Sequence, residues 1–523
     1  MEIALSPLQF ARRTRKLYAD SAAVVDEDTK LNYESFFERC DRWSAALQSL
    51  GICPGDRVAY VAPNTHAQLE SFYAVPQIGG VLVPLNYRLT ADDFAYLLNH
   101  SEARVLCADR DHIDAVERVR PQLRTVEQFV ALNGSRPGWL DYEEILNSSP
   151  ANFVTPDIKE TDLLTVNYTS GTSGKPKGVM ITHRNAYMNV IGTLLHFPLS
   201  AVDRYLWTLP MFHANGWTFV WTVTAVGATH ICLRKAEPRT VFERISRDGV
   251  TVFCAAPTVL ILLANFPAQL RPEVRRGLRV LTAGAPPAAA TIERMEGEFG
   301  WILTHIYGLT ETAPFITVCE LRPEHCLLSS QERAKIKARQ GVELLTSGEL
   351  RVVDARGRET PRDGKTVGEI IVRGNVVMQG YYKDAETTAQ VIRDGWFHTG
   401  DGAVVHPDGY VEIRDRLKDV IISGGENISS VEVEGALLHH PAVQEVAVVG
   451  FAHELWGEAP EAFVVRKQGA RLSEAELREF ARSRLAHFKV PQRFTFVTEL
   501  PKTATGKIQK YILRKGASAI NPQ

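Results

Sequence analysis

The 523-residue sequence lacks several features that would assign a protein to a specialised class. Its seven cysteines contain no C-x-x-C pair, which argues against a disulfide framework or a cysteine-rich metal site and indicates reduced thiols. Lysine and arginine together number 59, against 61 aspartates and glutamates, so no overall positive charge favours nucleic acid. The longest nearly apolar run, VFCAAPTVLILLANF, is shorter than the roughly 18 residues of a membrane span and contains Pro257. We therefore expect no nucleic-acid partner and no membrane span.

The two ends of the sequence also lack targeting signals. MEIALSPLQF has no basic region followed by a long apolar stretch, and the final residues INPQ are not a peroxisomal tripeptide. Together with the reduced cysteines, these absences predict a location in the cytoplasm.

What the sequence contains instead is a repeated alternation of short apolar runs with amphipathic segments. RVAYVAP and GVLVPLN flank a helical pattern, as in a β-α-β unit, and ARVLCAD, ATHICLR, TVFCAAP and RVLTAG predict further buried strands. After about residue 354, VGEIIVRG and GYVEIRD are spaced like antiparallel strands, and a compact α+β pattern follows from Arg416. We predict the α/β class, with a large layered α/β N-terminal domain that includes a β subdomain and a small α+β C-terminal domain.

One stretch, YTSGTSGKPKGV from Tyr168 to Val179, concentrates groups that bind phosphate. Its hydroxyl donors are Thr169, Ser170, Thr172 and Ser173. Its glycines and lysines, which permit close backbone approach and add positive charge, are Gly171, Gly174, Gly178, Lys175 and Lys177. A nucleotide-binding P-loop is excluded, because two residues rather than four separate Gly171 from Gly174 and because Pro176 follows the lysine. A flexible Gly/Ser linker is the alternative, but the strand-like LLTVNY before the loop and the helical spacing of THRNAYMNVIGTLLHF after it favour a binding site.

Further polar residues lie where a simple hydrophobic core would not require them. LPMFHANGW places His213 among bulky apolar side chains, although a lone buried histidine is more often a core residue. HIYGLTET follows a predicted strand and offers a ring, a hydroxyl and a carboxylate from Tyr307, Thr310 and Glu311. GWFHTGDGA places Asp401 in a predicted turn, where the carboxylate could accept two ribose hydroxyls or simply cap its own backbone. Two Gly-rich, lysine-bearing stretches follow, DRLKDVIISGGENISS and PKTATGKIQK.

Taken together, these stretches resemble the adenylate-forming superfamily, which contains acyl-CoA synthetases, coumarate-CoA ligases, luciferases and stand-alone adenylation domains. YTSGTSGKPKGV, LPMFHANGW, YGLTET, HTGD, DRLKDVIISGGENI and PKTATGKIQK occur in the family's order, and the resemblance covers nearly the whole chain. It implies an N-terminal adenylation domain over residues 1–415 and a mobile C-terminal domain over residues 416–523, with Lys418 as the hinge. It also implies ATP, coenzyme A and Mg²⁺, and a two-step reaction through an acyl-adenylate.

The resemblance implies four catalytic residues: Lys507, His213, Thr310 and Glu311. In the first step, a carboxylate attacks the α-phosphate of ATP. The loop from Thr169 to Lys177 is expected to hold the β and γ phosphates, while Thr310 meets the α-phosphate. Glu311 and Thr169 are expected to orient Mg²⁺, and Lys507 to bridge the carboxylate and the ribose-side oxygens. The residues expected to bind adenosine are Tyr307, the backbone of Gly284, Ala285 and Pro286, and the side chains of Asp401 and Arg416.

For the second step, the transfer of the acyl group to a thiol, the resemblance implies a rotation of the C-terminal domain about Lys418. This rotation would withdraw Lys507 and bring the SGGEN stretch to a coenzyme A tunnel. The expected CoA-side residues are Ser423, Gly424, Gly425 and Glu426. His213 is expected to swing between closing the tunnel and flanking the acyl carbonyl, whereas His183 is expected to be a helix-start residue outside the site.

The resemblance also implies an acyl pocket, formed by His213, Gly216, Trp217, Ala283 and Gly284. HANGW contains no acid that could bind a substrate ammonium group, so the acyl tail is expected to be uncharged. Trp217 is bulky, which favours short- or medium-chain aliphatic acids or small aromatic acids. These features predict an acyl-CoA ligase that activates a monocarboxylic acid.

Other interpretations remain open at this point. The acceptor could be a carrier-protein phosphopantetheine, or the chain could perform one half-reaction beside a partner enzyme. A non-catalytic nucleotide-binding regulator is a third alternative, against which Thr310, Glu311 and Lys507 argue. The segment SSQERAKIKARQGVELL, around Lys335, departs from the Gly- and Pro-rich pattern of many relatives and is predicted to be helical. It could affect dimer contacts or access to the site, and a homodimer is one expectation for the assembly.

Overall fold

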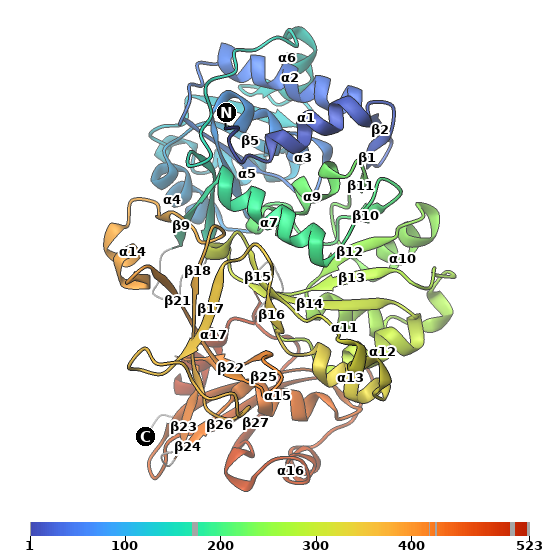
Figure 1. Ribbon diagram of the computed structural model, residues 1–523, viewed down its shortest axis with the longest axis vertical. Coiled ribbons are helices and arrows are strands. Elements are labelled where there is room, and N and C mark those ends of the chain that lie inside the picture. Colours follow the sequence, from blue (N-terminus) through green and yellow to red (C-terminus); the bar gives the residue numbers. More distant parts are fainter. Residues whose placement is uncertain (1, 170–175, 418, 424–425, 503–507, 520–523) are drawn as a thin grey trace.

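The computed structural model describes residues 2–169, 176–417, 419–423, 426–502 and 508–519. Within these ranges, three sheets and most of the helices form the larger part of the molecule, and a fourth sheet with its helices forms the smaller part at the C-terminal end (Figure 1). The predicted α/β class, with a large N-terminal and a smaller C-terminal domain, is confirmed. All seven cysteines lie in the described ranges and are free.

The first sheet consists mostly of parallel strands in the order β19-β9-β8-β4-β3-β5-β6-β7. Its strands are β3 (Arg57–Val61), β4 (Val81–Leu85), β5 (Ala103–Asp109), β6 (Gln128–Leu132), β7 (Leu140–Asp141), β8 (Leu163–Thr169), β9 (Lys177–Thr182) and β19 (Gly380–Tyr381). The helices of this part of the chain are α2 (Tyr33–Ser49), α3 (His66–Ala74), α4 (Ala91–Ser101), α5 (Arg110–Glu117) and α6 (Tyr142–Ser148). The predicted β-α-β unit is β3, α3 and β4, whose strands pair in parallel. Apart from the half-buried Arg57 at the start of β3, these strands are apolar because both of their faces are buried.

The second sheet has the order β16-β15-β14-β13-β12-β10-β11-β1-β2. Its strands are β1 (Ala22–Asp26), β2 (Thr29–Asn32), β10 (Arg204–Leu206), β11 (Thr229–Ile231), β12 (Val252–Ala255), β13 (Arg279–Thr282), β14 (Ile302–Gly308), β15 (Phe315–Val318) and β16 (Val342–Glu343). Helices associated with it are α1 (Leu8–Leu17), α7 (His183–His196), α8 (Ala214–Trp217), α9 (Phe219–Ala225), α10 (Pro238–Arg247), α11 (Pro257–Asn265) and α12 (Ala289–Phe299). One large core cluster joins residues of both sheets to residues of α7 and α9, including Val58, Ala186, Phe219 and Val252. The two sheets therefore share a buried helical layer.

The longest nearly apolar run of the sequence divides into β12 and α11. Pro257 is the first residue of α11, a position at which proline suits a helix because its missing N-H would have no partner there. Leu260 and Leu263 of this helix are fully buried. No helix among the described residues is long and apolar enough to cross a membrane.

The third sheet is the antiparallel β subdomain that the strand spacing predicted. Its order is β17-β18-β21-β20, with β22 paired to β21. The elements are β17 (Glu349–Val353), β18 (Gly368–Arg373), α14 (Ala385–Val391), β20 (Ile392–Arg393), β21 (Trp396–Val405) and β22 (Val411–Arg416). Between β18 and α14 the chain crosses to the first sheet, where Tyr381 of β19 pairs with Val179 of β9. This crossing joins the subdomain to the strand that follows residues 170–175.

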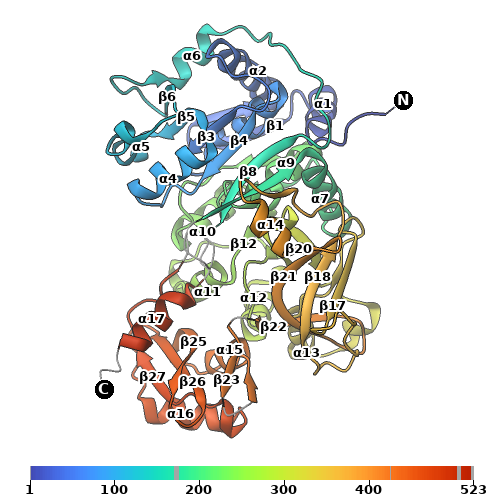
Figure 2. The ribbon, with the colours of Figure 1, turned by 90° about the vertical axis from the view of Figure 1, so that its left-hand side faces the viewer.

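The smaller part of the molecule is an α+β unit built on the order β24-β23-β26-β25, with β27 parallel to β26. Its elements are β23 (Ile421–Ser423), β24 (Glu426–Ile428), α15 (Ser430–Leu438), β25 (Val443–His453), β26 (Gly457–Arg466), α16 (Glu474–Arg482), β27 (Arg493–Phe496) and α17 (Lys510–Ala519). Figure 2 shows this unit below the larger part. Arg416 is the last residue of β22 and Ile421 the first of β23, so the predicted boundary after residue 415 falls within the end of β22. That boundary stays a prediction.

The charged segment around Lys335 forms α13 (Ser330–Lys337), which is helical as predicted. The helix begins with a capping box between Ser329 and Glu332. Its inner side packs on the second sheet: Ala334 is buried, and Lys337 Nζ donates to the Leu303 carbonyl at 3.1 Å and pairs with Glu296 of α12. The charges of this segment therefore do not prevent it from covering part of the core.

Candidate active site

Tyr307, Asp401 and Arg416 form one hydrogen-bonded cluster. The Tyr307 hydroxyl donates to Asp401 Oδ2 at 2.6 Å, and Arg416 Nε lies 3.2 Å from Asp401 Oδ1. β14 supplies the tyrosine, while Asp401 and Arg416 face each other in the register of β21 and β22. The sequence placed Asp401 in a turn, which is wrong: it lies within β21, next to the irregularity at residues 402 and 403. Three of the residues expected to bind adenosine thus meet at one point.

The electrostatics of this cluster follow from burial. Asp401 is 4% exposed. Burial, and then the charge of Asp401, raise the pKa of the Tyr307 hydroxyl well above its usual value, so it remains a neutral donor. Burial alone would lower the pKa of Arg416, but Asp401, Tyr307, Glu311 and Asp419 together outweigh it and the pKa is raised. A carboxylate oxygen can accept more than one hydrogen bond, so Asp401 retains capacity for a ligand hydroxyl.

The YGLTET stretch turns sharply back toward the first sheet. A Cβ on Gly308 would lie 1.8 Å from the Pro314 carbonyl oxygen, so only glycine fits at this close approach. The 3₁₀ turn η4 (Thr310–Thr312) follows and presents Thr310 and Glu311, both half-buried. The turn is fixed to the crossing segment, because Met378 N donates to the Glu311 carbonyl at 2.8 Å.

Tyr381 connects Glu311 to the edge of the glycine-rich loop. Its hydroxyl donates to Glu311 Oε1 at 2.9 Å, and Lys177 Nζ lies 5.1 Å from the centre of its ring. Lys177 pairs with Thr169 across β8 and β9, at the two ends of the loop. The sequence analysis missed Tyr381, since no local pattern links it to a carboxylate 70 residues away. The only available signal was its place in the GYY triplet, two residues of which form β19.

The expected acyl-pocket residues gather around Trp217. Its Cζ2 lies 3.7 Å from the position of a Cβ on Gly284, and its ring centre is 6.0 Å from that of Phe315 in an edge-on arrangement. Ala283 is buried, whereas His213 is half-buried at the start of α8. The backbone from Gly284 to Pro286, which was expected to contact adenine, follows β13 and is at least partly exposed. β13 is the neighbour of the strand that carries Tyr307, so this backbone begins beside the adenosine cluster.

Some of the predicted site residues lie outside the described part of the chain: Ser170, Gly171, Thr172, Ser173, Gly174, Lys175, Lys418, Gly424, Gly425 and Lys507. Of the CoA-side residues, Ser423 and Glu426 are described, and they pair with each other at the ends of β23 and β24. His183 is the first residue of α7 and is buried, with Nδ1 2.8 Å from Ser6 Oγ. Burial lowers the pKa of His183 to about 4, which suits a neutral structural side chain.

Comparison with known proteins agrees with the geometry. The family model described as AMP-binding enzyme matches residues 10–382, and that of the AMP-binding enzyme C-terminal domain matches residues 432–507. The chain belongs to the AMP-binding enzyme family. The resemblance to adenylate-forming enzymes seen in the sequence motifs is thereby confirmed.

Relatives of this AMP-binding enzyme match it over nearly its whole length. It is 41% identical to 4-hydroxybutyrate--CoA ligase 2 of Metallosphaera sedula over 98% of the chain and 95% of that protein. It is 38% identical to the peroxisomal trans-cinnamate:CoA ligase of Petunia hybrida over 99% of the chain and 95% of that protein. Among solved structures, the anthranilate CoA ligase AuaEII in complex with anthranoyl-AMP is similar with a TM-score of 0.88 at 25% identity, covering 99% of this chain and 98% of that one.

In this AMP-binding enzyme, the expected metal ligands Thr169 and Glu311 both lie in the described part of the chain. In the part of the chain that the structure describes, no three His, Cys, Asp or Glu side chains are grouped as in a protein-built metal centre. Glu311 and Thr169, both half-buried, supply one carboxylate and one hydroxyl. Such oxygen donors suit Mg²⁺, which proteins bind through one or two carboxylates while substrate phosphates and water complete the coordination. The residues therefore fit a Mg²⁺ ion that is held chiefly by ATP.

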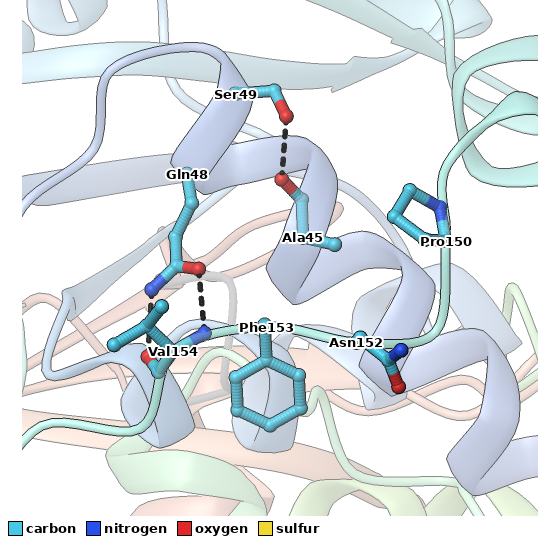
Figure 3. Close-up of a pocket in the computed structure, with 7 residues that line it drawn as sticks. All are labelled: Ala45, Gln48, Ser49, Pro150, Asn152, Phe153 and Val154. Atoms are coloured by element: carbon cyan, nitrogen blue, oxygen red, sulfur yellow. Dashed lines mark hydrogen bonds between the residues drawn. The ribbon is translucent and has the colours of Figure 1, made fainter.

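Of two cavities in this AMP-binding enzyme, one lies away from the predicted site residues and the other adjoins them. A groove of about 430 Å³ lies between α2 and residues 150–154 (Figure 3). There Gln48 Nε2 donates to the Val154 carbonyl, and Val154 N donates to Gln48 Oε1. The groove contains none of the predicted site residues. A second cavity, of about 330 Å³, is lined by Tyr96, His100, Pro176, Lys177, Tyr382, Asp384 and Thr387. It adjoins the loop at Lys177, on the side of α4.

Proposed function

We propose that this AMP-binding enzyme is an ATP-dependent acyl-CoA ligase. A carboxylate oxygen of a monocarboxylic acid bonds to the α-phosphorus of ATP and pyrophosphate leaves. The thiol of coenzyme A then loses its proton, its sulfur bonds to the acyl carbonyl carbon, and AMP leaves. One observation carries this proposal: two clusters of polar side chains share the YGLTET stretch. Tyr307, Asp401 and Arg416 form the cluster that suits adenosine. Glu311 and Tyr381 form the cluster that suits phosphate.

The two clusters are close enough to interact electrostatically. The charge of Glu311 contributes to raising the pKa of Arg416, and Arg416 acts in turn on Tyr381. Arg416 is therefore proposed to supply a positive charge that acts on both clusters. Preorganised charges of this kind stabilise a transition state without a cost of reorganisation.

Glu311 and Thr169 are the residues that would hold Mg²⁺ beside the phosphates. When bound, the ion neutralises charge on the phosphate oxygens and so favours the departure of pyrophosphate. Tyr381 fixes Oε1 of Glu311 through its hydroxyl and leaves Oε2 for this purpose. Lys177, the first residue of β9, lies over the ring of Tyr381 and is proposed to attract the β and γ phosphates.

The acid is proposed to have an uncharged short- or medium-chain aliphatic tail or a small aromatic one. Trp217 is 4% exposed and closes one side of the expected pocket against Gly284. The named substrates of the relatives, 4-hydroxybutyrate, trans-cinnamate and anthranilate, are all small monocarboxylic acids and support this class. His213, at the start of the same turn, is proposed to flank the acyl carbonyl.

The second step is proposed to need a rotation of the C-terminal domain about Lys418. Lys507 would act in the first step and withdraw for the second, when Ser423 and Glu426 come to the coenzyme A side. A location in the cytoplasm stays a prediction from the sequence, since two of the relatives are named peroxisomal. A homodimer stays a prediction as well.

Acid-dependent release of pyrophosphate and formation of acyl-CoA, measured with and without coenzyme A, test the proposal. Straight-chain, branched and small aromatic acids should be compared, with Lys507→Ala as the control. Loss of this ammonium should slow the first step by on the order of 10²- to 10³-fold, as for the loss of an oxyanion donor. Pyrophosphate without thioester would indicate a different thiol acceptor. Absence of both products with every acid would refute the proposal.

A further inference from the structure

A run of left-handed backbone lies in the HANGW stretch. Its consecutive residues all have positive φ: Ala214 at 36°, Asn215 at 47°, Gly216 at 54°, Trp217 at 51° and Thr218 at 68°. Only glycine adopts such values freely, and among the other residues asparagine tolerates them best. Because four of these five residues are not glycine, contacts with the rest of the protein must hold the turn in place.

The side chain of Asn215 provides the most extensive of these contacts. It is 3% exposed and forms a reciprocal pair with Asn167 of β8, since each Nδ2 donates to the Oδ1 of the other at 3.2 Å. Asn215 Oδ1 also accepts from the Thr165 hydroxyl at 3.0 Å, and Asn167 Nδ2 donates to that hydroxyl at 2.8 Å. The three polar side chains therefore satisfy one another inside the protein.

Packing on the other side of the turn leaves it little freedom. A Cβ on Gly216 would lie 2.5 Å from Cζ3 of Trp207, so the backbone of the turn lies directly on this indole ring. Trp217, which follows, packs between Gly284 and Phe315. A shift of the backbone at Asn215 would therefore move the Trp217 ring relative to Gly284.

The partners of Asn215 lie on a strand that leads to the phosphate side of the site. Residues 165, 167 and 169 alternate along β8 and so share one face of the sheet. β8 ends at Thr169, where the glycine-rich loop begins. The amide pair thus joins the turn at the acyl end of the site to the strand at its phosphate end.

We propose that Asn215 and Asn167 are positioning residues that hold the left-handed turn, and with it Trp217, at the acyl end of the site and thereby set the preference among acids. This inference rests on the function proposed above. The two amides bond each other and the Thr165 hydroxyl, so in this proposal both act through the position of Trp217. Asparagine is suited to the role because it accepts a positive φ and also supplies the paired amide.

Two variants separate the amide contact from the backbone conformation. Asn215→Gly keeps a residue that adopts positive φ freely but removes the amide, and Asn167→Ala removes the partner without altering the turn. Gln77→Ala is the matched control for loss of a buried amide: Gln77 is 8% exposed, and its Nε2 donates to Ser44 Oγ of α2 at 2.6 Å, away from α8. Urea unfolding of each variant measures the loss of stability, and kinetics with butyrate and benzoate measure the preference.

Both variants should raise the KM for the acid by about tenfold and change the butyrate-to-benzoate ratio of kcat/KM by about fivefold or more in the same direction. The KM for ATP should change by less than about threefold, since Tyr307, Asp401 and Arg416 are held by contacts with one another. The double variant should shift the ratio no further than the single variants, because both remove the same contact. Gln77→Ala should lose stability and leave the ratio unchanged.

An unchanged ratio in Asn215→Gly and Asn167→Ala, or additive shifts in the double variant, would overturn the proposal. Wild-type protein in the same assay keeps this outcome distinct from failure of the proposed function. If the wild type forms acyl-CoA while the variants retain its preference, only the positioning role is refuted. If the wild type forms no acyl-CoA from any acid, the proposed function itself is refuted.

Discussion

The contact between Tyr381 and Glu311 permits a prediction for Tyr381→Phe. The substitution removes one hydroxyl, which donates to Glu311 Oε1 at 2.9 Å, and keeps the ring beneath Lys177. A hydrogen bond to a charged group contributes about 1.5–3 kcal/mol, and the lower value applies here because Glu311 is half-buried and water can replace part of the contact. A loss of ~1.4 kcal/mol corresponds to a tenfold weaker equilibrium.

We therefore expect the Mg²⁺ concentration for half-maximal pyrophosphate release to rise about tenfold in Tyr381→Phe, with less than about twofold change in the KM for the acid. The same shift should appear without turnover, in a titration of the protein with Mn²⁺ and a non-hydrolysable ATP analogue followed by electron paramagnetic resonance. Tyr381→Leu also removes the ring beneath Lys177 and should raise the KM for ATP in addition.

The neighbouring Tyr382 supplies the control, because its hydroxyl donates to Glu102 at 3.3 Å and not to Glu311. Tyr382→Phe should leave the Mg²⁺ requirement unchanged. If both phenylalanine variants shift the metal titration equally, or neither shifts it, the Tyr381 hydroxyl does not orient Glu311 and the reasoning fails.

Further predictions concern the adenosine cluster, the acyl pocket and pH. Asp401→Asn should raise the KM for ATP by about 10- to 100-fold, because the half-buried Arg416 loses its anion, while the KM for the acid in the same kinetics stays constant; equal changes in both would contradict this role. Trp217→Ala should shift the optimum in an acid series toward longer tails, by roughly fourfold per added methylene at ~0.8 kcal/mol each, and an unchanged optimum would place Trp217 outside the pocket. Burial lowers the pKa of His183 and of His305 to about 4, so both are neutral in the folded state while the unfolded chain takes up protons near its ordinary value. These two groups should therefore lower the stability in urea as the pH drops from 7 toward 4, by ~2 kcal/mol per histidine between pH 7 and 5; a flat profile between pH 7 and 5 would refute it.

Much of the fold was readable from the sequence because its signals are local. The continuous apolar runs of β3 and β4 identify strands buried on both faces, and the spacing after residue 354 identifies the antiparallel subdomain. The position of Asp401 was misjudged for the same reason: glycines on both sides resemble a turn, whereas here they accompany an irregularity within β21.

The sequence by itself determined the chemical groups of the candidate site, through motifs in which a few adjacent residues supply hydroxyls, glycines and charges. Only the tertiary structure decided which of these groups touch. Tyr381 reaches Glu311 across 70 residues because β19 crosses to the first sheet, and Asn215 reaches Asn167 across 48 residues because α8 turns left-handed above β8. Such contacts depend on strand order, on register and on a strained backbone that distant packing maintains. None of these leaves a periodic or compositional trace in the neighbouring sequence.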